Sequence, residues 1–364
     1  MEKNFLRKLF PKNIKLFAKN RSVVGVDIGS SSIKIVQLRK ERERAVLETY
    51  GELAIGPYVK RSVGEIVQIS EKIAVTMIKD LFKESGASAT DVAVAIPVKS
   101  SFITAVKLPI VDGKNMDDII RFEARKYIPV PLGEVEMDWW VLNREGEATA
   151  SKKQMADILL VVIYKEIIRK YRNILTKAGL KVKLFEIEIF SGWRSLNFRP
   201  TAPVLVLDLG ASTTKMSIVE KGLLGSSHTI DKGAQAITDA ISKSLGISFE
   251  RAEEMKHKIG LSPNPEHREL VKVAEPILDF IFAEAKQFAH SYSRKYGSSV
   301  GQVILSGGGA LLNGITDVAV KNLGVEVVVA DSFSKLDYPP FLQGVLKEIG
   351  PTFSTAIGLA LRGL

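Results

Sequence analysis

Two copies of one short motif decide the fold: VDIGSSSIK at residues 26–34 and LDLGASTTK at residues 207–215. An Asp, a Gly and a Lys stand at the same places in both copies, 181 positions apart. Each copy is an apolar run, a turn of Gly and hydroxyl side chains, and a second run, which predicts a β-hairpin. The turn exposes backbone N–H groups that can bind phosphate, because Gly allows close approach. Two such hairpins in register predict a site that holds a nucleotide triphosphate from two sides, and two ordinary hairpins are the alternative.

The aspartates and the turn residues are the first candidate site residues. We expect Asp27 and Asp208 to face each other across a cleft and to hold Mg²⁺ through water, because hard oxygen ligands suit this ion. They are also the candidate catalytic residues. The candidate phosphate-binding residues are Gly29, Ser30, Ser31, Ser32 and Lys34 in the first copy and Gly210, Ala211, Ser212, Thr213 and Lys215 in the second. Alternation along a strand also allows either lysine to point to the surface.

A third glycine-rich stretch reads VILSGGGALLNG at residues 303–314, which predicts a strand, a triple glycine and a helix start. Three residues without side chains let a flat base lie against the backbone, so Gly307, Gly308, Gly309 and Leu311 are the candidate base pocket. A tight packing turn is the alternative. Neither GxGxxG nor GxxxxGK[ST] occurs, so Rossmann and P-loop nucleotide sites are not indicated.

Three more residues complete the predicted nucleotide site. Glu253 and Lys256 stand one helical turn apart and are placed to contact a ribose. An i,i+3 ion pair on the surface is the alternative. Gly233 precedes a predicted helix and is expected to let the backbone approach the nucleotide.

Composition limits the classes of protein that fit. The chain has 364 residues, of which 46% are hydrophobic and 25% charged, so it is globular and long enough for two or more domains. Cysteine is absent, which excludes disulfides, thiol catalysis and cysteine zinc sites. The four histidines form no close ligand pair, and no apolar run approaches the roughly 18 residues of a membrane span.

The net charge of +10 is unevenly distributed, because residues 1–20 contain six basic residues and one acidic residue. The remainder is mildly basic and shows no stripe typical of nucleic-acid binding. Residues 1–20 are also rich in Phe, Leu and Ile, but Pro11 interrupts any single helix. The segment is either a contact with an anionic membrane surface or a tail that docks on its own protein or a partner.

Hydrophobic periodicity divides the body into five parts. We expect a basic segment (1–21), a first-lobe core (22–100), an inserted α+β subdomain (101–163), a return to the first lobe (164–200) and a second lobe (201–364), whose last helix is free to pack back on the first. Predicted strands span 23–28, 33–38, 45–53, 91–97, 102–108, 136–142, 157–163, 181–186, 204–207, 214–219 and 223–230. Predicted helices span 64–84, 116–127, 164–178, 187–196, 234–245, 249–259, 277–296 and 354–361.

Together these features resemble the actin-like ATPase superfamily: two phosphate hairpins, a glycine loop and a final helix, STAIGLAL at residues 354–361. A small α+β insertion after the strand at 91–97 resembles the FtsA division proteins and the related PilM family of type IV pilus assembly. The similarity to PilM rests on VGVDIGSSSIK at 24–34, FEARKYIP at 122–129 and AEEMK at 252–256, and it covers residues 22–364.

The resemblance implies an α/β, ribonuclease H-like fold with two lobes and an FtsA-type inserted subdomain. It also implies a cytoplasmic protein, peripheral to the inner membrane, that binds ATP and Mg²⁺. The implied partner is the cytoplasmic N-terminal peptide of PilN, within the inner-membrane pilus assembly complex. The peptide is expected between the first-lobe core and the insert, with 102–108 and 116–127 as the candidate region. Self-association into a homo-oligomer fits the same family.

Two other functions stay open from the sequence. A small-metabolite kinase needs a carboxylate base near the end of the strand at 91–97, but Pro97 to Ser100 supply none, and Glu186 or Glu188 are further candidates to position a water. An FtsA-like filament protein is expected to carry a C-terminal membrane helix, and this chain ends at Leu364 without one. ATP turnover needs a placed water as well as the hairpins, so we expect it to be slow or undetectable.

Overall fold

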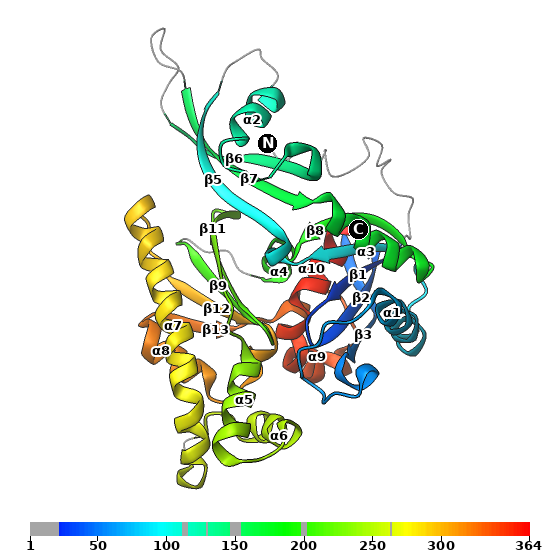
Figure 1. The fold of residues 1–364 in the computed structure, drawn as a ribbon, viewed down its shortest axis with the longest axis vertical. Helices are drawn as coiled ribbons and strands as arrows, with labels where there is room; N and C mark the ends of the chain where they lie inside the picture. The colour runs from blue at the N-terminus through cyan, green and yellow to red at the C-terminus, as the bar shows by residue number, and fades with distance from the viewer. Residues whose placement is uncertain (1–21, 111–115, 129, 146–153, 198–201, 263) are drawn as a thin grey trace.

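The computed structural model describes residues 22–110, 116–128, 130–145, 154–197, 202–262 and 264–364. The basic segment expected at residues 1–21 lies outside the described residues. The described chain forms two lobes and a smaller subdomain that projects from one end of the molecule (Figure 1).

The first lobe is built on a five-stranded sheet in the order β3-β2-β1-β4-β8. Its first three strands form an antiparallel meander, and β4 and β8 continue the sheet in parallel with β1. Every residue of β4 is buried, as expected for a parallel strand covered on both faces. The strands are β1 (Ser22–Ile28), β2 (Ser32–Glu41), β3 (Arg44–Ala54), β4 (Asp91–Ile96) and β8 (Lys181–Ile187).

The second lobe repeats this sheet in strand order and in strand direction. Its order is β11-β10-β9-β12-β13, with an antiparallel meander followed by two parallel strands. The strands are β9 (Val204–Leu209), β10 (Thr214–Glu220), β11 (Leu223–Ile230), β12 (Gln302–Ser306) and β13 (Glu326–Val329). The repeated motif of the sequence is therefore part of a repeated sheet, and the predicted α/β two-lobed fold is confirmed.

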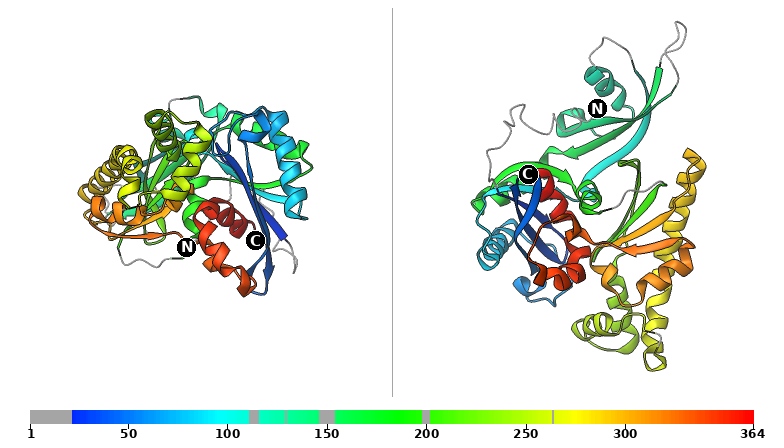
Figure 2. Two further views of the ribbon diagram at one scale, coloured as in Figure 1. Left: turned by 90° about the horizontal axis from the view of Figure 1, so that it is seen from below. Right: turned by 180° about the vertical axis from the view of Figure 1, so that it is seen from behind.

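The insert is a three-stranded antiparallel sheet with one helix. It contains β5 (Ser101–Ile110), α2 (Met116–Ala124), β6 (Val135–Glu145) and β7 (Gln154–Tyr164), and β7 is the central strand. One face, with Ile158 and Leu160, packs under α2, while the other, with Leu159 and Val161, joins the core of the first lobe. Alternation along β7 therefore ties the insert to the lobe. The insert lies at the opposite end of the molecule from α5 and α6 (Figures 1 and 2).

Helices cover both faces of the first sheet. α1 (Glu71–Ser85) and α3 (Lys165–Lys177) pack on one face, and α10 (Ser354–Gly363) packs on the other. Gly25 of β1 permits this packing, because a Cβ there would lie 1.9 Å from the carbonyl oxygen of Ala356. α4 (Glu188–Ser195) packs on α10 and reaches the second sheet through Trp193.

The remaining helices belong mainly to the second lobe. They are α5 (Ala234–Leu245), α6 (Phe249–Ile259), α7 (Arg268–Tyr296), α8 (Ile315–Leu323) and α9 (Gln343–Ile349). Among the described residues, no helix is both long enough and apolar enough to cross a membrane.

Several predicted helix boundaries were wrong. α1 begins at Glu71 rather than at 64, because the Ser70 side chain caps it by accepting from the amide of Ile73. α7 begins at Arg268, nine residues before the predicted 277, and contains Pro276. Leu270 and Ala274, which precede the proline, continue the buried face of the helix. The helix expected directly after the triple glycine is a 3₁₀ turn, and α8 begins only at Ile315.

Candidate functional site

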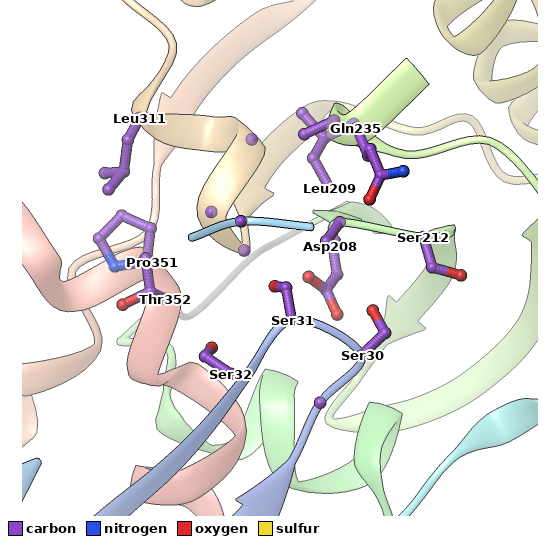
Figure 3. Close-up of a pocket in the computed structure, with 18 of the residues that line it drawn as sticks. Ser30, Ser31, Ser32, Asp208, Leu209, Ser212, Gln235, Leu311, Pro351 and Thr352 are labelled. Carbon is purple, nitrogen blue, oxygen red and sulfur yellow. The ribbon is translucent and has the colours of Figure 1, made fainter. Parts of the chain in front are cut away.

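A pocket of about 330 Å³ lies between the two lobes. This volume is within the range of roughly 300–1,000 Å³ that is usual for small-molecule sites. All the predicted site residues line it except Gly233, so residues that are far apart in the chain converge on one place. Ser30, Ser31 and Ser32 of the first hairpin face Asp208 and Ser212 of the second across the pocket (Figure 3).

The two hairpins have matching geometry. Asp27 lies opposite Lys34 in the β1–β2 ladder, and Asp208 lies opposite Lys215 in the β9–β10 ladder. Both turns close in the same way: the amide of Gly29 donates to the carbonyl of Ser32 at 3.0 Å, and in the second hairpin the amide of Gly210 donates to the carbonyl of Thr213, also at 3.0 Å.

The turn amides are free to bind a ligand. Within the described structure, the backbone N–H groups of Ser30, Ser31, Ala211 and Ser212 donate to no protein acceptor. Unpaired amides that converge on one pocket form an anion-binding nest. The residues present therefore fit a polyphosphate.

The ionised form of Asp27 is disfavoured in this pocket. Burial raises the pKa of Asp27 to about 6, against the opposing effect of Lys34. Glu188 and Asp208 raise it further, and Lys215 lowers it. A carboxyl whose ionised form is disfavoured in this way is stabilised when a cation enters.

Lys215 joins the two lobes at the base of the pocket. Its ammonium lies 2.9 Å from Asp208 and 2.8 Å from Glu188, which belongs to the first lobe. Burial opposes the charge of Lys215, but the two carboxylates outweigh it and raise its pKa. Both predicted lysines line the pocket rather than the surface, and Lys34 is held by Ser32 at 2.6 Å and Glu52 at 2.9 Å.

Of the two further candidate carboxylates, Glu188 lines the pocket and Glu186 does not. β8 runs beside β4, so Glu188, which follows β8, lies next to the end of β4. One oxygen of Glu188 accepts a hydrogen bond from the amide of Val98 at 2.9 Å. Its other oxygen binds Lys215. Glu186 lies elsewhere, in a buried cluster with Arg194 and Arg362.

The three glycines after β12 differ in what a side chain would meet. A Cβ at Gly307, whose φ is +80°, would lie 2.3 Å from Asp208 Oδ1. At Gly309 it would lie 2.7 Å from the Leu209 side chain, but at Gly308 nothing lies within 4 Å. Gly307 and Gly309 are therefore required for packing, and Gly308 faces open space.

Glu253 and Lys256 form a buried pair, so the alternative of a surface pair was wrong. Lys256 is 6% exposed, and its ammonium lies 2.7 Å from Glu253 and 2.9 Å from Thr238. Burial opposes the charge of Glu253, but His257, Lys256 and Thr238 prevail and lower its pKa to about 2.

Gly233 serves packing rather than the pocket wall. A Cβ there would lie 2.5 Å from the carbonyl oxygens of Gly210 and Ala211. Its lack of a side chain lets α5 start directly on the second hairpin, where the amide of Ala234 donates to Gly210 at 2.8 Å. The expectation that Gly233 lets the backbone approach a nucleotide stays a prediction, since Gly233 is absent from the pocket lining while Ala234 and Gln235 belong to it.

Several pocket residues were not predicted from the sequence. They include Glu52, Gln235, Pro351 and Thr352. Pro351 and Thr352 lie with Leu311 on one side of the pocket, and Gln235 lies on the other (Figure 3). None belongs to a phosphate-binding motif, so only the tertiary fold identifies them.

The described residues contain no group of three or more His, Asp or Glu side chains that could hold a metal alone. Mg²⁺ commonly keeps several waters and takes one or two carboxylates plus phosphates. Asp27 and Asp208 therefore fit a magnesium ion that arrives with a nucleotide.

Comparison with known proteins agrees with this architecture. The family model described as type IV pilus assembly protein PilM matches residues 25–364. A solved PilM–PilN type IV pilus biogenesis complex contains a chain with a TM-score of 0.80 and 24% identity, covering 94% of this chain and 98% of that one. MreB5 of Spiroplasma citri bound to AMPPNP has a TM-score of 0.52 and 13% identity, with 94% and 95% covered.

The similarity to curated proteins is shorter. The cell division protein FtsA of Staphylococcus epidermidis is 24% identical over 258 residues, which is 65% of this chain. The chain spans about half (54%) of the length of that protein. These likenesses show an actin-like fold, and a fold neighbour of this kind has been solved with a bound nucleotide.

Proposed function

The chain belongs to the PilM family of type IV pilus assembly proteins, and from that premise we propose that it is an ATP-binding scaffold of the pilus assembly platform. The observation that carries this proposal is the pair of matched hairpins around one pocket, with free amides at both turns. The proposed location is the cytoplasmic face of the inner membrane, where the family assembles.

The proposed ligand is ATP with Mg²⁺. The amides of both hairpin turns hold the phosphates, and Lys34 and Lys215 add charge at the same end of the pocket. Asp27 and Asp208 hold the waters of the metal. Gly308 and Leu311 flank the base, while Glu253 and Lys256 face the ribose. Bound Mg²⁺ would add positive charge beside Asp27, whose ionised form burial disfavours.

Slow turnover is part of the proposal. A water that attacks a phosphate must be oriented by a base with a free lone pair. Glu188 is a pocket carboxylate that could take this role. The amide of Val98 and the ammonium of Lys215 each bond to one of its oxygens and fix its orientation, so it has to serve the water with its remaining lone pairs. A protein that retains ATP in this way works as a scaffold rather than as a fast kinase.

The proposed partner is the cytoplasmic N-terminal peptide of PilN, because the similar solved complex pairs a PilM chain with PilN. The insert is the proposed docking element, because α2 exposes a large apolar side chain there. Phe122 on α2 is 62% exposed, and Tyr127 just beyond α2 is 42% exposed.

Calorimetric titration of a synthetic PilN N-terminal peptide into protein loaded with Mg²⁺–ATP tests this function. We expect saturable one-to-one binding that Phe122→Ala weakens about tenfold, since buried aromatic anchors dominate such interfaces. Phe341→Ala is the matched control, because Phe341 is 81% exposed but lies beside α9. Absence of binding, in a sample shown to hold ATP, would contradict the proposed partner.

A further inference from the structure

One segment of the first lobe touches the second lobe beside the pocket. Residues 61–69, here called the strap, connect the short 3₁₀ turn Gly56–Val59 to α1. The amide of Arg61 donates to Gly56, and the amide of Val67 donates to the carbonyl of Ser30 at 3.2 Å. Val63 and Gly64 line the pocket. The strap is therefore anchored to the turn of the first phosphate hairpin.

The second-lobe contact of the strap is made by Gln235. The amide of Ile66 donates to Gln235 Oε1 at 2.6 Å, although the two residues are 169 positions apart. Gln235 Nε2 donates to Asp239 at 3.3 Å, one turn further along α5. Because the carboxylate requires a donor and the Ile66 amide requires an acceptor, the orientation of the Gln235 amide is fixed.

Gln235 is tied to the second hairpin as well. Its own backbone amide donates to the carbonyl of Ala211 at 3.0 Å. A continuous series of contacts thus runs from Ser30 through Val67, Ile66 and Gln235 to Ala211, and it joins the turns of the two phosphate hairpins.

Gly64 gives the strap a second, steric contact with the other lobe. It has a φ of +85°, and a Cβ there would lie 2.7 Å from Oε1 of Glu253. The strap therefore fits closely against the buried Glu253–Lys256 pair. A side chain at position 64 therefore requires either the strap or the Glu253 carboxyl to shift, and the positive φ adds backbone strain.

We propose that the strap is a gate over the pocket and that Gln235 is the positioning residue that keeps it closed. Resting on the proposed nucleotide function, this inference adds control of exchange. The strap connects the turns of the two hairpins, and a ligand bound by both hairpins holds these turns at the same separation. Ligand and strap therefore stabilise the same closed state of the pocket. Release then requires the Ile66–Gln235 bond to break, which slows dissociation.

Stopped-flow release of a fluorescent ATP analogue in Mg²⁺ tests the gate. We expect Gln235→Ala to raise the dissociation rate about tenfold and to raise the association rate too, because a closed strap blocks both directions. Gly64→Ala is expected to act in the same direction. Gln302→Ala is the matched control, because its amide bonds exposed Glu326 away from the pocket, and it should leave both rates unchanged.

Amide hydrogen exchange measures opening of the strap in the absence of nucleotide. The amide of Val67 is expected to be protected in the wild type and to exchange faster in Gln235→Ala, while the strands of both sheets keep their protection. Unchanged release rates in both pocket variants, or a Val67 amide that exchanges as fast in the wild type as in Gln235→Ala, would overturn the gate. Failure of the wild type to bind the analogue, with normal Val67 protection, would instead overturn the nucleotide function.

Discussion

The ammonium of Lys215 lies 2.9 Å from the carboxylate of Asp208, directly across the β9–β10 ladder. The same ammonium also binds Glu188 of the first lobe, and both lysine and glutamate are largely buried. Because the Lys215 ammonium bonds to a carboxylate of each lobe at the bottom of the pocket, it holds the two lobes at a fixed separation. Removing Lys215 takes the ion-pair partner from both carboxylates in a poorly hydrated site.

The first prediction concerns the ion pair of Lys215 and Glu188. Lys215→Met should lower the free energy of unfolding by about 3 kcal/mol, because breaking a buried ion pair strands a charge. Combining it with Glu188→Gln should cost less than the sum of the single changes. Urea denaturation of the four proteins measures the difference, and strictly additive losses would show that the two residues do not interact.

The second prediction separates the glycines of the base pocket. Gly308→Val should abolish ATP binding while the melting temperature stays near that of the wild type, because its side chain enters open space. Gly307→Val should destabilise the fold itself, since its Cβ meets Asp208 and its φ is positive. Thermal melts and nucleotide titrations of both variants provide the comparison. Normal ATP affinity in a folded Gly308→Val protein would remove Gly308 from the site.

The third prediction is a pH dependence. The pKa of Asp27 is raised from 3.8 to about 6, so the folded protein binds more protons than the unfolded chain between these values. Without nucleotide, the contribution of Asp27 to stability should therefore fall as the pH rises from 4 to 6, by roughly 1–3 kcal/mol. Asp27→Asn should abolish this component and stabilise the nucleotide-free protein at pH 7. Denaturation midpoints across pH 4–7 test it, and identical profiles for both proteins would contradict the assignment.

The fourth prediction concerns residues 1–20, which lie outside the described structure. Six basic residues among apolar ones favour attachment to anionic lipid, at roughly 1 kcal/mol for each basic residue near the surface. Deleting residues 1–20 should weaken co-sedimentation with anionic liposomes and leave ATP affinity intact. Equal co-sedimentation of the full and shortened chains would favour the alternative of a tail that docks on protein.

Local patterns were sufficient to predict the hairpins and the glycine turn. Each hairpin is specified by adjacent residues, and the constant spacing of Asp27 and Asp208 from their Gly and Lys neighbours revealed the duplication. The buried strand β4 and the insert likewise followed from uninterrupted or alternating apolar residues.

Features that depend on long-range contacts could not be predicted from the sequence. Gln235 meets the strap only because the lobes fold together, and Glu188 enters the pocket only because β8 lies beside β4. A helix was expected to begin at residue 277, but buried residues before Pro276 extend α7 back to Arg268. The contact of Gly233 with the second hairpin turn is likewise set by the tertiary fold, because the sequence does not show which segment lies beside it.

The most direct test of the account is calorimetric titration of ATP, with Mg²⁺, into the wild-type chain and into Asp208→Ala. We predict one site in the wild type and loss of most of the affinity in the variant, because Asp208 is the proposed metal residue and bonds to Lys215. Equal affinity in both proteins, or no binding to a folded wild type, would contradict the central claim that the paired hairpins form a nucleotide site.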